Sequence, residues 1–246
     1  MKIENQIYML EISHNMMGSE RVINPTVILD NDWLVLVDAG FPGQINQIRE
    51  AIEKEGLSFS TLNRIILTHR DIDHIGCVSD ILRELPHKVE VFAHEKEKAY
   101  INGEKKPVKL ASLEDNLEQL PDNMKIIYEK LKSGFEMSRV NVGETLIDGQ
   151  ELPICSGITV IYTPGHTPGH ICLYLKKWKI LIAGDILTVK EGKLSKADQS
   201  INLDNQLNMI SMKKLMEYDI ETVICYHGGI YKGNVNKRIA ELANDL

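Results

Sequence analysis

Long apolar runs, paired cysteines and an excess of positive charge are all absent from this chain of 246 residues. No stretch approaches the roughly 20 apolar residues that a membrane-spanning helix needs, so we expect no membrane segment. The first eight residues show neither the apolar core nor the cleavage site of a signal peptide. The four cysteines stand singly in apolar surroundings, which predicts buried, reduced thiols and a cytoplasmic protein. They are Cys77, Cys155, Cys172 and Cys225.

The charge balance narrows the choice of partners. A net charge of −7 argues against nucleic acid, because phosphate backbones are bound by basic surfaces. The small basic cluster of Lys105, Lys106 and Lys109 is more typical of a solvated loop. The Gly-x-Ser-x-Gly elbow that presents a nucleophilic serine in many hydrolases is missing as well. We expect a small-molecule substrate, and the sequence leaves the oligomeric state open.

Hydrophobic patterning predicts an α/β (α+β) fold, and 246 residues are enough for one large domain or two small ones. A mostly helical segment at about 94–140 interrupts the strands, and we interpret it as an insertion that could shape a pocket. Apolar runs predict strands at 6–13, 25–30, 33–38, 64–67, 89–93, 157–162, 171–175, 179–184 and 222–225. Helical periodicity and capping signals predict helices at 45–55, 205–217 and 234–243, among others.

One turn carries an unusual density of metal-binding side chains. His69, Asp71, Asp73 and His74 follow the predicted strand 64–67 and precede a predicted helix. Two aspartates one residue apart repel each other unless a positive charge lies between them, and a divalent cation would supply it. This turn therefore predicts the centre of a metal site. The alternative is that Asp71 only caps the start of the helix, with one metal site empty.

Further candidate ligands end other predicted strands. His166 lies in a rigid turn with two Pro-Gly steps, and Asp185 and His227 each follow an apolar strand. Each of these residues is weak evidence for a metal site by itself, but α/β proteins assemble their sites at the carboxyl ends of successive strands. Asp38 ends the strand 33–38 and either caps a turn or supports the metal ligands, and we favour the second role.

These motifs, in this order, resemble those of the metallo-β-lactamase-fold hydrolase superfamily. The family signature is His-x-His-x-Asp-His followed by a single His, an Asp and a final His, and the Val-Asp-Ala-Gly around Asp38 matches its first motif. The resemblance spans about residues 25 to 230 and implies a single domain over residues 1–246. It implies a four-layer αβ/βα sandwich with a dinuclear metal site at one edge of the paired sheets. The corresponding residues here are His69, Asp71, Asp73, His74, His166, Asp185 and His227.

The resemblance also implies roles for these residues. It assigns one metal to His69, Asp71 and His166. It assigns the other to Asp73, His74 and His227, with Asp185 bridging both and His170 structural. The implied activity is that of a dinuclear metal-dependent hydrolase, in which a metal-bridging hydroxide attacks a lactone, thioester or other ester. Asp73 would be the catalytic residue that orients the hydroxide and relays its proton.

Asp71 departs from the pattern, because most members have His at that position. Two divalent ions are expected, with zinc the usual metal. A carboxylate is a harder ligand than imidazole, so Asp71 would shift affinity toward manganese or iron. The alternatives to acyl hydrolysis are a phosphodiesterase, a di-iron redox protein and a metal-bound binding module without turnover.

Overall fold

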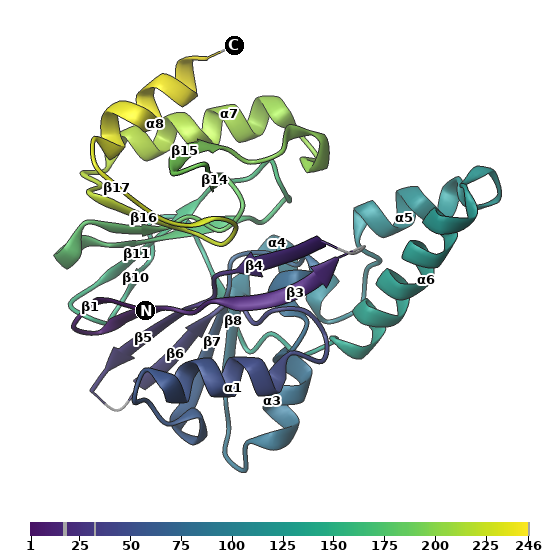
Figure 1. Cartoon of the computed structure of the whole chain (residues 1–246), viewed down its shortest axis with the longest axis horizontal. Helices are drawn as coiled ribbons and strands as arrows, with labels where there is room; N and C mark the ends of the chain where they lie inside the picture. The colour runs from purple at the N-terminus through teal and green to yellow at the C-terminus, as the bar shows by residue number, and fades with distance from the viewer. Residues whose placement is uncertain (17–18, 32, 246) are drawn as a thin grey trace.

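Two packed β-sheets with helices on both outer faces make up the computed structural model, which describes residues 1–16, 19–31 and 33–245 (Figure 1). The strand order is β1-β2-β5-β6-β7-β8-β9 in the first sheet and β10-β11-β12-β13-β16-β17 in the second. The four-layer αβ/βα sandwich expected from the sequence is therefore confirmed.

The first sheet is buried on both faces. Along β6, Leu34 and Leu36 pack toward helices α1 (Ile45–Lys54) and α3 (Val78–Glu84), whereas Val35 and Val37 face the second sheet. A strand covered on both sides needs apolar residues at successive positions, which explains its continuous hydrophobic run. The strands are β1 (Lys2–Glu4), β2 (Ile7–Met9), β5 (Thr26–Asp30), β6 (Trp33–Val37), β7 (Leu62–Leu67), β8 (Glu90–His94) and β9 (Glu144–Leu146).

The second sheet repeats this arrangement. Ile182 and Ile224 pack against the first sheet, while Leu181 and Val223 pack against helices α7 (Asn205–Lys214) and α8 (Val235–Asn244). Its strands are β10 (Glu151–Leu152), β11 (Ile158–Tyr162), β12 (Ile171–Leu175), β13 (Ile180–Ile182), β16 (Thr222–Cys225) and β17 (Gly229–Lys232).

Two hairpins depart from the predicted elements. The predicted strand 6–13 is wrong as one unit, because β2 pairs with β5 in the first sheet whereas β3 (Ile12–Met16) pairs with β4 (Ser19–Ile23) in a separate hairpin. The exposed Glu11 separates the two strands. The second hairpin pairs β14 (Leu187–Lys190) with β15 (Lys193–Lys196). Its strands are short and rich in lysine, so they contain no apolar run from which the sequence could predict them.

The helical insertion between β8 and β9 is confirmed. It contains α4 (Glu95–Ile101), α5 (Val108–Asp115) and α6 (Asp122–Met137), and Figure 1 shows α5 and α6 extending away from the sandwich. Across the described ranges, no helix has the length and apolarity needed to cross a bilayer. All four cysteines are free and buried, as predicted.

Strand direction brings the candidate ligands to one place. Strands β6, β7 and β8 are parallel in the first sheet. In the second sheet β11 and β13 share a direction, because each is antiparallel to β12, and β13 is parallel to β16. The carboxyl ends within each sheet therefore meet at a common edge, and the two edges together form the site described next.

Candidate metal centre

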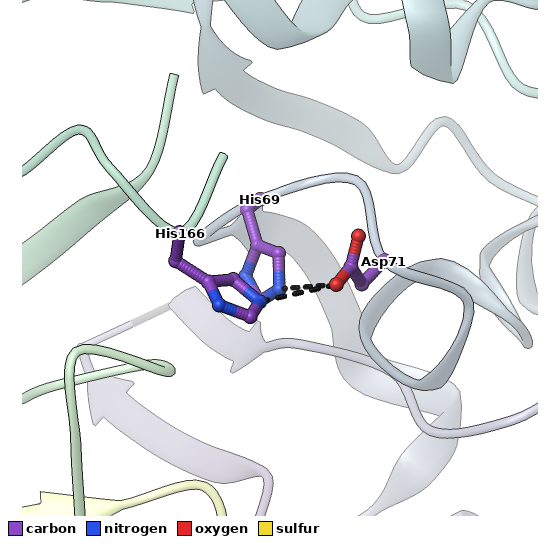
Figure 2. Close-up of side chains that lie close together, drawn as sticks. All are labelled: His69, Asp71 and His166. Carbon is purple, nitrogen blue, oxygen red and sulfur yellow. Dashed lines mark hydrogen bonds and ion pairs between the residues drawn. The ribbon is translucent and has the colours of Figure 1, made fainter. Parts of the chain in front are cut away.

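The first group of donors joins His69 and Asp71, on the turn after β7, with His166, on the turn after β11 (Figure 2). Oδ2 of Asp71 lies 3.1 Å from Nε2 of His166 and 3.6 Å from Nε2 of His69. Both histidines are fully buried, while the carboxylate is partly exposed. Three donor atoms from two distant parts of the sequence thus face one point.

The second group combines Asp73 and His74, in the short helix α2 (Ile72–Ile75), with His227 after β16. Oδ2 of Asp73 lies 3.2 Å from Nε2 of His227 and 3.8 Å from Nε2 of His74. The His227 side chain is 40% exposed, so this group is open to solvent on one side.

The Asp185 carboxylate lies between the two groups. Its Oδ2 is 3.6 Å from Nε2 of His166 and 3.5 Å from Nε2 of His227. Its Oδ1 is 3.4 Å from Nε2 of His74. Six of the seven residues singled out in the sequence thus form two donor groups of three, and the seventh, Asp185, lies between them. Within each group the ligand atoms lie within 4.8 Å of one another.

The donor set fits divalent cations. Nε2 of His69, Nε2 of His74 and Oδ1 of Asp185 are buried and, among the described residues, have no hydrogen-bond partner. Buried polar atoms are rarely left without a partner, because the loss of solvation is then uncompensated. Imidazole nitrogens and carboxylate oxygens that converge in this way have the composition of a metal site.

Neighbouring side chains orient the ligands. Nδ1 of His74 donates to Oδ2 of Asp38 at 2.9 Å. Nδ1 of His69 donates to Oγ1 of Thr68 at 3.1 Å, and that hydroxyl donates to Asp38 at 2.8 Å. Nδ1 of His166 donates to Oδ1 of Asn202 at 3.0 Å. A neutral imidazole that donates through Nδ1 keeps the lone pair of Nε2 for a metal, so these contacts orient the rings for binding through Nε2.

Asp38 has the supporting role that we favoured from the sequence. Its backbone adopts φ +61°, a left-handed turn conformation that aspartate tolerates better than most residues. Its buried carboxylate accepts from the backbone N–H of Thr68 at 2.8 Å as well as from His74. It therefore ends the strand and also fixes two of the candidate ligands.

Asp71 does not act as a helix cap. It occupies the N-cap position of α2, but its side chain makes no capping hydrogen bond. The carboxylate instead contacts His166 and, from α5, the ammonium of Lys109, whose Nζ also lies 3.3 Å from Nε2 of His166. Burial would raise the pKa of this carboxyl, but the neighbouring His166 and His69 and the charge of Lys109 hold it well below its usual range.

The carboxylates also change the protonation of the histidines. Burial opposes protonation of His74, yet Asp38, Asp185 and Asp73 raise its pKa well above the usual value. Burial likewise opposes protonation of His227, and Asp185 and Asp73 raise its pKa to about 10. A metal ion must displace such protons, so binding at these nitrogens is expected to release protons.

His170 belongs to the support of the site, as expected. Its Nε2 accepts from the backbone N–H of Asp185 at 3.0 Å, and its Nδ1 donates to Oγ1 of Thr163 at 2.8 Å. Burial, helped by the neighbouring His166, lowers the pKa of His170 to about 3, so the ring stays neutral. A Cβ on Gly184 would lie 2.6 Å from Nε2 of His170, which explains a glycine directly before Asp185.

Three residues at the site were not recognised in the sequence. Lys109 was interpreted as part of a solvated loop, but it reaches Asp71 from α5. Asn202 carries no local motif. Tyr226 is a buried strand-end residue whose hydroxyl donates to the carbonyl of Asp73 and accepts from Gly40 N–H at 3.2 Å. Its position directly before His227 was the one available signal.

Comparison with known proteins defines the class. Residues 18–227 match the family described as the metallo-beta-lactamase superfamily. The chain belongs to this superfamily and is a metallo-hydrolase of it.

Individual proteins are similar to this chain in sequence or in fold. The chain is similar to "Probable metallo-hydrolase YflN" of Bacillus subtilis (strain 168), with 32% identity over 230 residues that cover 86% of this chain and 82% of that protein. The fold is similar to that of the metallo-beta-lactamase family protein TTHA1429 from Thermus thermophilus, with a TM-score of 0.75, 22% identity and coverage of 98% and 79%. It is also similar to TTHA1623 in a di-iron-bound form, with a TM-score of 0.63, 20% identity and coverage of 96% and 99%.

Proposed function

We propose that this protein is a dinuclear metal-dependent hydrolase of acyl substrates, namely lactones, thioesters or other esters. The observation that carries the proposal is the position of Asp185 between two donor groups, each with its own pair of histidines. One divalent ion would be held by His69, Asp71 and His166. The other would be held by Asp73, His74 and His227, with Asp185 shared between them.

In this hydrolysis the two ions and the carboxylate of Asp73 would have separate tasks. When bound, the two ions would activate water as a nucleophile and polarise the acyl carbonyl. The Asp73 carboxylate is partly exposed, at the side where the site opens to solvent. It is therefore placed to accept the proton of the attacking water and to pass it to the leaving group. The hydrogen bond from Tyr226 to the Asp73 carbonyl holds this residue in position.

Charge supports a small acyl substrate. The chain carries a net charge of −7, and among the ion pairs of the described residues Lys109 is the lysine or arginine side chain that contacts a candidate ligand. A nucleic-acid phosphodiesterase would instead need a basic surface to hold the phosphate backbone.

The proposal is tested by an activity screen of the metal-loaded full chain against lactones, thioesters, aryl esters and bis-phosphoesters. We expect turnover of at least one acyl class, and loss of that turnover after treatment with a chelator. Cleavage of bis-phosphoesters alone would favour a phosphodiesterase. An iron-linked absorption band together with oxygen consumption would favour a redox protein. TTHA1623, which is similar in fold, has been crystallised in a di-iron-bound form.

The choice of metal is expected to depend on Asp71. Zinc is the expected metal, and a third carboxylate in the donor set should increase the share of manganese or iron. We expect Asp71→His to shift the metal content of protein purified without added metal toward zinc, as measured by elemental analysis. Because this change also removes the ion pair with Lys109, Lys109→Met is the control. An equal dominance of zinc in the wild type and in Asp71→His would contradict this expectation.

A further inference from the structure

A buried ion pair lies next to the first donor group, and its arginine is on the same turn as His69 and Asp71. Arg70, between His69 and Asp71, contacts Glu97 of helix α4, with Nη1 lying 3.0 Å from Oε2 and 3.2 Å from Oε1. Both side chains are almost completely inaccessible to solvent, at 1% and 0% exposed. The ring of Tyr100 covers the guanidinium at 4.0 Å. This is an unusual environment for two full charges.

Stability alone does not explain the pair. Removing two charges from water is costly, and a buried ion pair often stabilises a fold no better than apolar residues of the same size. Nε of Arg70 has no hydrogen-bond partner among the described residues, so the guanidinium is not fully satisfied. The position of the Glu97 carboxylate suggests a second role.

The carboxylate of Glu97 also accepts two backbone N–H groups. Oε2 accepts from Arg70 N at 3.2 Å, and Oε1 accepts from Gly169 N at 2.5 Å. Arg70 lies on the turn after β7 in the first sheet, whereas Gly169 lies on the turn between β11 and β12 in the second. A Cβ on Gly169 would lie 2.7 Å from Cγ of Glu97, so this close approach requires glycine. One side chain from the insertion thus joins the two turns.

We propose that Glu97 is a positioning residue that sets the spacing of His69, Asp71 and His166 before a metal binds. The inference rests on the proposed function, because it takes these three residues as the ligands of one ion. All three come from the two turns that Glu97 joins. In the second group, Asp73 and His74 lie farther along the chain in α2, and His74 is held by Asp38. Glu97 therefore acts selectively on the first ion.

The test is a zinc titration of chelator-treated full-length protein against a competing chelator. Glu97→Gln keeps the size of the side chain but removes the charge and one acceptor. We expect one of the two zinc ions to bind about 10- to 100-fold more weakly, as is typical when the support of a ligand is removed, and the other to bind unchanged. Asp71→Asn and His227→Ala, assigned to opposite ions, identify the weakened step. We also expect kcat to fall more than KM rises.

Glu90→Gln is the matched control. Glu90 of β8 pairs with Arg64 of β7 at 3.2 Å, and Arg64 stacks on Trp33 at 3.5 Å. This pair lies near the amino-terminal ends of the two strands, away from the donors. We expect Glu90→Gln to leave both zinc affinities unchanged.

A second variant separates positioning from stability. Arg70→Met combined with Glu97→Gln removes the charge that Glu97→Gln alone would leave buried and unpaired. We expect the double variant to recover the melting temperature but not the affinity for the first ion. Wild-type affinity for both ions in either folded variant, or equal weakening of both, would overturn the proposal. Failure of the wild type to bind two ions or to hydrolyse any acyl substrate would instead count against the proposed function.

Discussion

Replacing Asp73 by asparagine is expected to lower kcat/KM by about 10³-fold, in the range that general acid–base groups contribute. The physical reason is that the Asp73 carboxylate is both a candidate metal ligand and a group that substrate can reach. Oδ2 lies 3.2 Å from Nε2 of His227, within the second donor group, and the side chain is partly exposed to an arriving substrate. Asparagine cannot accept the proton of the attacking water, and it is also a weaker ligand than a carboxylate. The measurement is steady-state kinetics on the best acyl substrate, together with the metal content of the variant.

Single Cys→Ser variants are the control for the Asp73 prediction, because they test a thiol nucleophile. Burial raises the pKa of Cys77 and Cys172 to about 12 and that of Cys155 to about 11, so these thiols stay protonated at neutral pH. Burial also raises the pKa of Cys225 well above its usual value. We therefore expect each serine variant to keep most of the activity. Comparable losses from Asp73→Asn and from any of these variants would contradict the mechanism.

Asp38→Asn is expected to weaken metal binding by about 10- to 100-fold, although Asp38 itself contacts no metal position. One carboxylate oxygen accepts from the backbone of Thr68, and the other accepts from the Thr68 hydroxyl and from Nδ1 of His74. In asparagine, an NH2 group replaces one of these two oxygens, so it must face either the Thr68 backbone or His74. Facing His74, it would favour the tautomer with the proton on Nε2, which then could not bind a metal. Zinc titration and thermal unfolding measure the two consequences.

Asparagine is the right substitution at position 38, because it also tolerates the left-handed backbone that this position requires. Loss of the buried charged hydrogen bonds is expected to destabilise the fold by about 3 kcal/mol. Asp30→Asn is a suitable control, since Asp30 also ends a strand and accepts from a backbone N–H, that of Cys155 at 2.7 Å, but touches none of the candidate ligands. We expect it to lower stability without changing zinc affinity. Unchanged zinc affinity in Asp38→Asn would show that its hydrogen bonds do not control the ligands.

Much of the site could be predicted because each ligand sits in a local pattern. An apolar strand followed at once by His69, by Asp185 or by His227 is visible in a short stretch of sequence, and strand ends of this kind meet at one sheet edge. The same reasoning located Asp38 and the helical insertion. It did not find Lys109 or Glu97. Both lie on short helices that carry several charged residues, and nothing in the neighbouring sequence shows whether their side chains point to solvent or to the site.

The sequence by itself determined which residues stand at the carboxyl ends of the strands, because strand and turn propensities act over a few neighbouring residues. Only the tertiary structure decided that Asp185 lies between the two donor groups and that Glu97 joins a turn of one sheet to a turn of the other. These positions of Asp185 and Glu97 follow from the packing of the two sheets around a shared apolar core. Val35 and Ile66 line this core from the first sheet, and Ile182 and Ile224 line it from the second. Such packing is a property of the assembled layers, because it depends on side chains far apart in sequence.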